Sequence, residues 1–180
     1  EVHFDAEHFF DGFAANKKYA ISIVKEALAS GADWVVLCDT NGGCMPDQVK
    51  ETIESLIEEG IDASRLGIHA HNDTENAVAN SLAAVQAGVR QIQRPLNGLG
   101  ERCGNANLIS LLPTLLLKPQ FSEKFVTGVT SDSLKELTRV SRIMDDVLNR
   151  VPNRFAPYVG SSEFAHKAGL HANAILKNTE

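Results

Sequence analysis

The sequence predicts an α/β fold, and more specifically the second half of a (β/α)8 TIM barrel, with four β-α units followed by helical segments. Strand-like and helix-like segments alternate with a period of about 30 residues, as in consecutive βαβ units. Polar clusters follow the strands at Glu7, 39–40, 71–73 and 97–105. A (β/α)8 barrel carries its active site on these loops, whereas a doubly wound sheet does so only at its switch point. Since a full barrel takes about 250 residues, we expect half of one.

Caps and apolar runs define the elements in chain order. The expected strands are residues 2–4, 33–38, 66–70 and 90–95, and the expected helices are residues 17–29, 46–59, 75–87 and a segment from Asn105 or Asn107 to 117. Asn16 is suited to cap the first helix, whose apolar residues recur at helical spacing. The apolar run 34–37 is typical of a parallel strand buried on both faces. Pro46 begins the second helix and Gly88 ends the third, positions where these residues are preferred.

The pattern changes at Pro119. We therefore expect the barrel half over residues 1–118 and a helical extension over 119–180. Within the extension, Ser131 and Asp132 predict the start of one long helix, because apolar residues recur at helical spacing as far as Val151. A Gly- and His-bearing segment follows near the end of the chain.

Composition and charge exclude several classes of protein. The net charge is −6, with Lys and Arg dispersed, so we expect no nucleic-acid partner. No apolar run approaches the roughly 20 residues that span a bilayer, so we expect no membrane partner. Cys38, Cys44 and Cys103 are odd in number and lack metal-binding spacing, which favours a reducing cytoplasm. The chain begins without Met in strand-like sequence, so we expect it to be a fragment of a longer protein.

The pair His69 and His71 is the strongest functional signal in the sequence. Both lie at the end of the predicted strand 66–70, and side chains two apart on a strand share a face. Two converging imidazoles are a large part of a typical ligand set for a catalytic divalent metal. The alternative is that both histidines are packed and hydrogen-bonded within the core.

Three segments resemble the DRE-TIM metallolyase superfamily, and within it the α-isopropylmalate synthase-like branch. They are residues 67–73, the loop Asn-Gly-Leu-Gly-Glu-Arg-Cys-Gly-Asn at 97–105, and residues 164–171. Residues 4–13 and 37–43 are most similar to the citramalate-forming members of that branch. The resemblance covers nearly the whole chain and implies the back half of the catalytic barrel followed by the start of a linker subdomain.

The resemblance implies a Claisen condensation of acetyl-CoA with an α-keto acid, with pyruvate giving citramalate as the closest match. It implies a divalent metal ion (Zn, Mn, Co or Mg) that acts as a Lewis acid on the ketone. It also implies that the full-length protein is a homodimer.

The site residues that the resemblance implies are His69, His71 and Asn105 for the metal, Thr40 for the keto-acid carboxylate, and Glu7 and His171 for catalysis. In the catalytic pair His171 would handle the proton, and Glu7 would orient or charge it. The family's Arg-Asp-Gly-type motif, which supplies an acidic metal ligand and an arginine, is not in this chain. We therefore expect the isolated chain to be inactive.

Several alternatives remain open on the sequence alone. Glu7 could be an exposed loop acid, Thr40 could serve a turn or a helix cap, and Arg102 could pin its loop through a salt bridge. The keto acid could be that of 2-isopropylmalate or homocitrate synthases. The reaction could instead be the carbon–carbon cleavage of HMG-CoA lyases or the hydrolysis of amidohydrolases, and the chain could be a non-catalytic assembly fragment.

Overall fold

The computed structural model describes residues 1–177, with the side chains of residues 170–172 and 175 outside that description. The chain forms two compact units, Glu1–Gly128 and Val129–Glu180, which are described separately. Within the described residues, no helix is long and apolar enough to cross a membrane.

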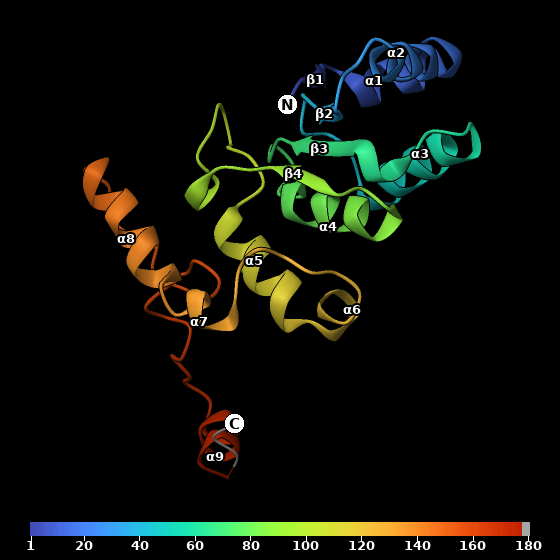
Figure 1. Cartoon of the computed structure of the whole chain (residues 1–180). Helices are drawn as coiled ribbons and strands as arrows, with labels where there is room; N and C mark the ends of the chain where they lie inside the picture. The colour runs from blue at the N-terminus through green and yellow to red at the C-terminus, as the bar shows by residue number, and fades with distance from the viewer. Residues whose placement is uncertain (178–180) are drawn as a thin grey trace. The chain divides into compact units, whose positions relative to one another are not determined.

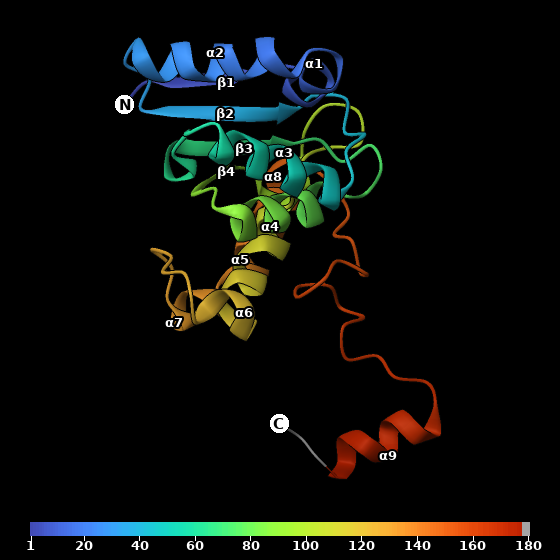
Figure 2. The same ribbon diagram turned by 90° about the vertical axis from the view of Figure 1, so that its right-hand side faces the viewer.

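The first unit is built on a parallel sheet whose strands follow each other in chain order (Figures 1 and 2). Its strands are β1 (His3–Ala6), β2 (Trp34–Asp39), β3 (Leu66–Ala70) and β4 (Gln91–Gln93). A doubly wound sheet would reverse its strand order at a switch point, whereas a barrel adds each strand beside the last. The order β1-β2-β3-β4 is therefore that of a barrel segment.

The helices of this unit are α1 (Phe9–Ala15), α2 (Lys17–Ala29), α3 (Pro46–Glu58), α4 (Ala77–Ala87), α5 (Leu108–Leu117) and α6 (Pro119–Ser122), with 3-10 turns η1 (Ala63–Arg65) and η2 (Leu96–Gly98). Helices α2, α3 and α4 lie along one face of the sheet (Figure 2). Two of the predicted caps are confirmed: the Asn16 side chain accepts from the Tyr19 N–H, and the Asn107 side chain accepts from the Ile109 N–H.

Strand alternation divides the sheet into an apolar face and a polar face. On β3, Leu66, Ile68 and Ala70 are fully buried in the core that the helices cover. The intervening His69 points the other way, as the two-residue period requires. The polar residues of the sequence are therefore collected on the face opposite the helices.

The polar face is strongly curved. Gln91 Nε2 of β4 lies 3.0 Å from His3 Nδ1 of β1, although two strands separate β4 from β1. Side chains from strands so far apart in a flat sheet could not meet, because neighbouring strands are about 4.8 Å apart. Gly67 on β3 makes room for this contact, since a side chain there would collide with Gln91. The sheet thus has the curvature of a barrel wall.

Helix α1 has no counterpart among the predicted elements. Its residues 9–15 contain Gly12 and three phenylalanines, which give no helical pattern. The helix forms because Phe9 and Phe10 are buried, with their rings packed edge to face at a centroid distance of 5.8 Å. Tertiary packing therefore determines that residues 9–15 are helical.

The second unit contains α7 (Ser131–Leu134), α8 (Leu137–Val147) and α9 (Gly169–Lys177). The prediction of one long helix from Ser131 to Val151 is wrong. Thr130 is the N-cap of α7, with its hydroxyl accepting from the Ser133 N–H. The chain breaks between α7 and α8, and Asn149, in the left-handed region at a φ of 51°, follows the end of α8. Asn is one of the residues that adopt this conformation just after helices.

Candidate active site

His69 and His71 project from the polar face at the carboxyl end of β3. Their rings are stacked with centroids 5.2 Å apart, so the two imidazoles converge as the sequence predicted. His71 Nδ1 is buried and has no hydrogen-bond partner. Burial lowers the pKa of His71, and the charges of His69 and Arg102 lower it further. The lowered pKa favours the neutral ring, which keeps one nitrogen lone pair for a ligand.

Asn105 joins this pair from the loop that follows β4. Its Nδ2 lies 3.1 Å from His69 Nε2, and its backbone pairs with that of His71 in an isolated antiparallel bridge. Asn105 is only 9% exposed. The structure therefore brings together the side chains of the three predicted metal ligands.

Glycines fix the position of Asn105. A Cβ atom on Gly100 would overlap Asn105 Oδ1, so only glycine lets that side chain lie where it does. Gly104 has a φ of 89°, and a Cβ atom there would overlap the Gly98 carbonyl oxygen. The glycines of this loop permit close packing around the amide, which explains why the loop is rich in them.

Glu7 and Thr40 meet at the ends of β1 and β2. The Thr40 hydroxyl donates to Glu7 Oε2 at 2.8 Å and accepts from the backbone N–H of His8, also at 2.8 Å. Both hydrogen-bonding roles of this hydroxyl are in use. Glu7 is exposed, so it faces the solvent at the edge where the histidine pair also lies.

Arg102 ties these strand ends together. Its guanidinium donates to both carboxylate oxygens of Asp73, each at 2.9 Å, and Nη2 also donates to the Thr40 carbonyl at 2.7 Å. The hydrogen bonds from Arg102 hold the pKa of Asp73 below its usual value. Arg102 thus links the loops after β2, β3 and β4, which is the pinning role that the sequence left open. Asp73 is the partner that sequence reasoning did not identify.

His171 falls within α9, and its side chain lies outside the described part of the structure. Of the other groups on the polar face, Cys38 of β2 is buried beside Asp5 and Glu7. Burial, together with these two carboxylates, raises the pKa of the Cys38 thiol to about 12. The thiol is therefore protonated at neutral pH, which makes it a poor nucleophile.

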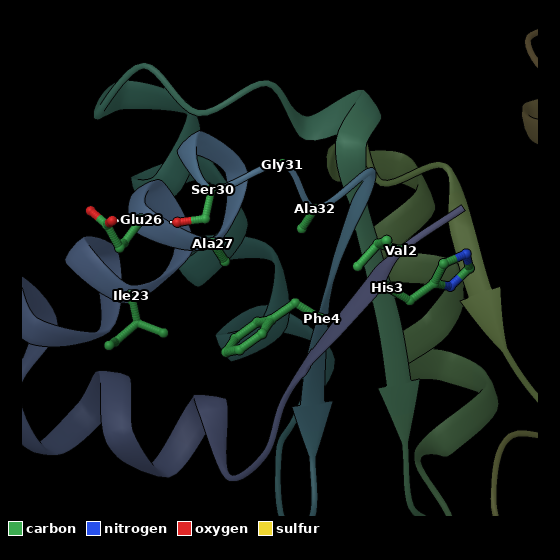
Figure 3. Close-up of a pocket in the computed structure, with 9 residues that line it drawn as sticks. All are labelled: Val2, His3, Phe4, Ile23, Glu26, Ala27, Ser30, Gly31 and Ala32. Atoms are coloured by element: carbon green, nitrogen blue, oxygen red, sulfur yellow. Dashed lines mark hydrogen bonds between the residues drawn. The ribbon is translucent and has the colours of Figure 1, made fainter.

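One cavity of about 440 Å³ lies elsewhere, between β1 and α2. Figure 3 shows Phe4 and Ile23 facing this hollow, with His3 directed to the other side of β1. Its lining is largely apolar, and it includes none of the predicted site residues. The candidate site is accordingly the open polar edge at the strand ends.

The residues present fit a divalent cation. Imidazole nitrogens and amide oxygens are common ligands for borderline divalent metals. His71 Nδ1 is a buried nitrogen that has no hydrogen-bond partner. The nitrogen and oxygen of an Asn side chain are assigned from their hydrogen bonds. Rotation of the Asn105 amide by 180° would place its oxygen, instead of Nδ2, next to His69 and toward a cation. Across the described residues, no three His, Cys, Asp or Glu side chains form a closed metal cluster. The candidate ligand set among these residues is therefore incomplete, since it consists of two histidines and one amide.

The family comparison is specific. Residues 2–147 match the family described as HMGL-like. Over the whole chain, an (R)-citramalate synthase of Aquifex aeolicus is 51% identical, and a 2-isopropylmalate synthase of Methylacidiphilum infernorum is 36% identical. The chain spans 33% and 35% of the length of these two relatives, about a third in each case.

Solved structures agree on the fold. An HMG-CoA lyase from Acinetobacter baumannii, in complex with coenzyme A and 3-methylmalate, is similar with a TM-score of 0.65 and 25% identity. The similarity covers 85% of this chain and 49% of the lyase. The family match over residues 2–147 contains the whole sheet and its strand-end loops. The chain therefore belongs to the HMGL-like family, which is the DRE-TIM group that its histidine pair and Gly-rich loop resemble.

Proposed function

We propose that the full-length protein condenses acetyl-CoA with pyruvate to form citramalate, so that the acetyl group becomes an alkyl group on transfer. The observation that carries the proposal is the convergence of His69, His71 and Asn105 at the same edge of the sheet as the Glu7–Thr40 pair. Support comes from the 51% identity to an (R)-citramalate synthase, against 36% to a 2-isopropylmalate synthase, over the same residues.

The metal-binding part of the site would be His69, His71 and Asn105. A bound divalent ion, Zn, Mn, Co or Mg, would supply Lewis-acid polarisation of the ketone carbonyl. Thr40 would hold the carboxylate of the keto acid by turning its O–H away from Glu7. This exchange is balanced, because the hydroxyl can still accept from the His8 N–H while it donates to the substrate.

Release of Glu7 from Thr40 would prepare the catalytic pair. Glu7 would then orient His171 and stabilise its charged form, since a carboxylate beside an imidazole favours the imidazolium. His171 would take a proton from the methyl group of acetyl-CoA as that carbon bonds to the ketone carbon of pyruvate. The carbonyl π bond would break at the same time, and the ketone oxygen would take up a proton to become the hydroxyl group of the product. Hydrolysis of the thioester by water would yield free CoA and citramalate.

The lyase alternative shares the fold but less of the sequence. The similar HMG-CoA lyase is 25% identical. That lyase is in complex with coenzyme A and 3-methylmalate, which supports an acyl-CoA and a small branched diacid as ligand classes for this fold. We infer that the present chain uses its polar strand-end edge for condensation, in a homodimeric cytoplasmic enzyme.

The test is CoA-thiol release from acetyl-CoA by the full-length protein. Pyruvate, 2-oxoisovalerate and 2-oxoglutarate are offered separately, with a His69→Ala variant as control. We expect release with pyruvate that the variant loses. Preference for another keto acid would retain the reaction and change the substrate, whereas no release with any of them would refute the condensation.

A further inference from the structure

We propose that Gln93 and Asp5 are positioning residues that fix the tautomer of His69 and so direct its Nε2 lone pair to the metal. The inference deepens the proposed function and rests on it, because it assumes that His69 binds a cation. Neither residue is among the site residues that the sequence predicted.

The hydrogen bonds from His69 through Gln93 to Asp5 all have the same donor-to-acceptor direction. Gln93 Nε2 donates to Asp5 Oδ1 at 3.0 Å, and Gln93 Oε1 lies 2.7 Å from His69 Nδ1. An ionised carboxylate can only accept, so Asp5 selects the amino end of the Gln93 amide. The Gln93 carbonyl oxygen is then presented to His69, and it can only accept as well.

This polarity determines where the His69 proton resides. Because Gln93 Oε1 accepts, Nδ1 of His69 must carry the proton, and Nε2 is left with a lone pair. Nε2 is the nitrogen that faces Asn105 at 3.1 Å, on the side of the proposed metal ligands. Metal-ligating histidines commonly donate their other N–H to a fixed acceptor, which sets ring orientation and raises affinity.

The fold explains why these residues can meet. His69 and Gln93 are opposite each other in the β3–β4 register, and the curvature of the sheet brings Asp5 of β1 within reach of β4. The alternation of the strands places Asp5 and Gln93 on the same polar face as His69. A signal was thus present in the sequence, but it required knowledge that β1 and β4 side chains meet.

The chain contains a matched control in Gln91. It lies two residues before Gln93 on the same face of β4, and its Nε2 approaches His3 Nδ1 at 3.0 Å. Its neighbour in register on β3 is Gly67, so Gln91 has no metal ligand to orient. A Gln-to-Leu change at this position removes the same groups from the same face without affecting His69.

The experiment measures Mn²⁺ affinity of the full-length metal-free protein by competition with a chromophoric chelator. We expect Gln93→Leu to weaken binding by about 10- to 100-fold, the usual effect of removing such a partner. Gln91→Leu should change binding by less than about 2-fold, and Asp5→Asn by only a few-fold, because an amide oxygen can still accept from Gln93. Thermal unfolding of each variant separates these effects from a loss of fold.

A double variant provides a rescue. With Gln93→Glu alone, two carboxylates would face each other and binding should weaken. Adding Asp5→Asn supplies an amide that donates to the new carboxylate, which also accepts from His69 Nδ1. The direction of one hydrogen bond is reversed while the His69 tautomer is kept, so affinity should return to within a few-fold of wild type.

A spectroscopic readout follows the tautomer itself. In the metal-free protein labelled with ¹⁵N-histidine, the resonances absent from His69→Ala identify His69, and we expect the Nδ1–H form in wild type. Gln93→Leu should move it toward the Nε2–H form. Equal affinities for the Gln93→Leu and Gln91→Leu variants, or an unchanged tautomer, would overturn the inference while leaving the condensation intact. Absence of metal binding by wild type would overturn both.

Discussion

At the scale of single residues, the candidate site depends on hydrogen bonds whose direction is set by neighbours. Thr40 is the clearest case, because its hydroxyl donates to Glu7 and accepts from a backbone N–H at the same time. A hydroxyl in this position can exchange one acceptor for another at little cost. This gives Thr40 a means of coupling substrate binding to the release of Glu7.

A Thr40→Val substitution tests this role. Valine has nearly the same shape but no hydroxyl, so it can neither hold a substrate carboxylate nor contact Glu7. A hydrogen bond to a charged group contributes about 1.5–3 kcal/mol, so kcat/KM for pyruvate should fall about 10- to 100-fold. Steady-state kinetics measure this, with Thr40→Ser as the matched variant that keeps the hydroxyl. Wild-type kinetics for the valine variant would exclude Thr40 from the substrate site.

Glu7 supports a second prediction at this scale. Glu7→Gln keeps the acceptor for Thr40 but removes the negative charge that would stabilise a protonated His171. We expect kcat to fall by about 10²- to 10⁴-fold, the range for loss of acid–base catalysis, with little change in thermal stability. Glu101→Gln, at an exposed carboxylate of the neighbouring loop, serves as the control. A kcat within a few-fold of wild type would assign Glu7 to the surface.

Sequence reasoning predicted some of these residues better than others. His69 and His71 follow from the two-residue period of a strand. Asn105 was obtained from the resemblance of its loop, since no local periodicity places residue 105 beside residue 69. Gln93 and Asp5 were not identified because their contact crosses two intervening strands, which only the curvature of the folded sheet makes possible.

At the scale of elements, the loop 97–105 is the part of the site most dependent on its sequence. It crosses from β4 to the end of β3 and is attached there by the Arg102–Asp73 ion pair and the Asn105–His71 bridge. Its glycines are required for close approach of side chain and backbone. The loop therefore acts as a rigid support for Asn105.

Gly100→Ala tests the steric part of this account. The new Cβ atom would displace the Asn105 side chain, so Mn²⁺ affinity should fall by about 10-fold or more with a small change in unfolding temperature. Gly12→Ala is the matched control, because the residue is inside α1 and nothing outside its chain neighbours and its own helix backbone lies within 4 Å of the added Cβ. That control should bind metal normally and gain about 0.5–1 kcal/mol in stability. Equal metal affinity in the two variants would contradict the proposed position of Asn105.

Arg102 tests the attachment of the same loop. Arg102→Lys keeps the charge but loses the planar fork that contacts Asp73 and Thr40 together. We expect faster amide hydrogen exchange at residues 98–104 and a lower kcat/KM, both more pronounced in Arg102→Met. Unchanged exchange in Arg102→Met would show that the loop is held by its backbone alone.

The elements themselves were largely predictable. The strand Leu66–Ala70 and the helix Lys17–Ala29 match the expected bounds, because alternation and caps are local signals. Helix α1 could not be predicted, since burial of Phe9 and Phe10 forms it. The prediction of one long helix from Ser131 was wrong, because the periodicity of apolar residues does not reveal the break between α7 and α8.

At the scale of the whole molecule, sequential parallel strand order and curvature identify a barrel wall, as the spacing of the polar clusters predicted. The proposed metal donors among the described residues are two histidines and one amide, without a carboxylate. We therefore expect the isolated 180-residue chain to bind Mn²⁺ more weakly than the full-length protein and to release no CoA. Thiol release by the isolated chain at the full-length rate would contradict this expectation.

Product analysis distinguishes condensation from the other reactions that the fold supports. The full-length protein with Mn²⁺ is given pyruvate and acetyl-CoA labelled with ¹³C in the methyl group, and the products are followed by NMR. We expect the label to appear in the methylene carbon of citramalate, and we expect a chelator or His69→Ala to abolish this signal. If the label remains in acetyl-CoA, and a hydroxyacyl-CoA supplied in a separate reaction is cleaved, the condensation is refuted and the protein is a lyase.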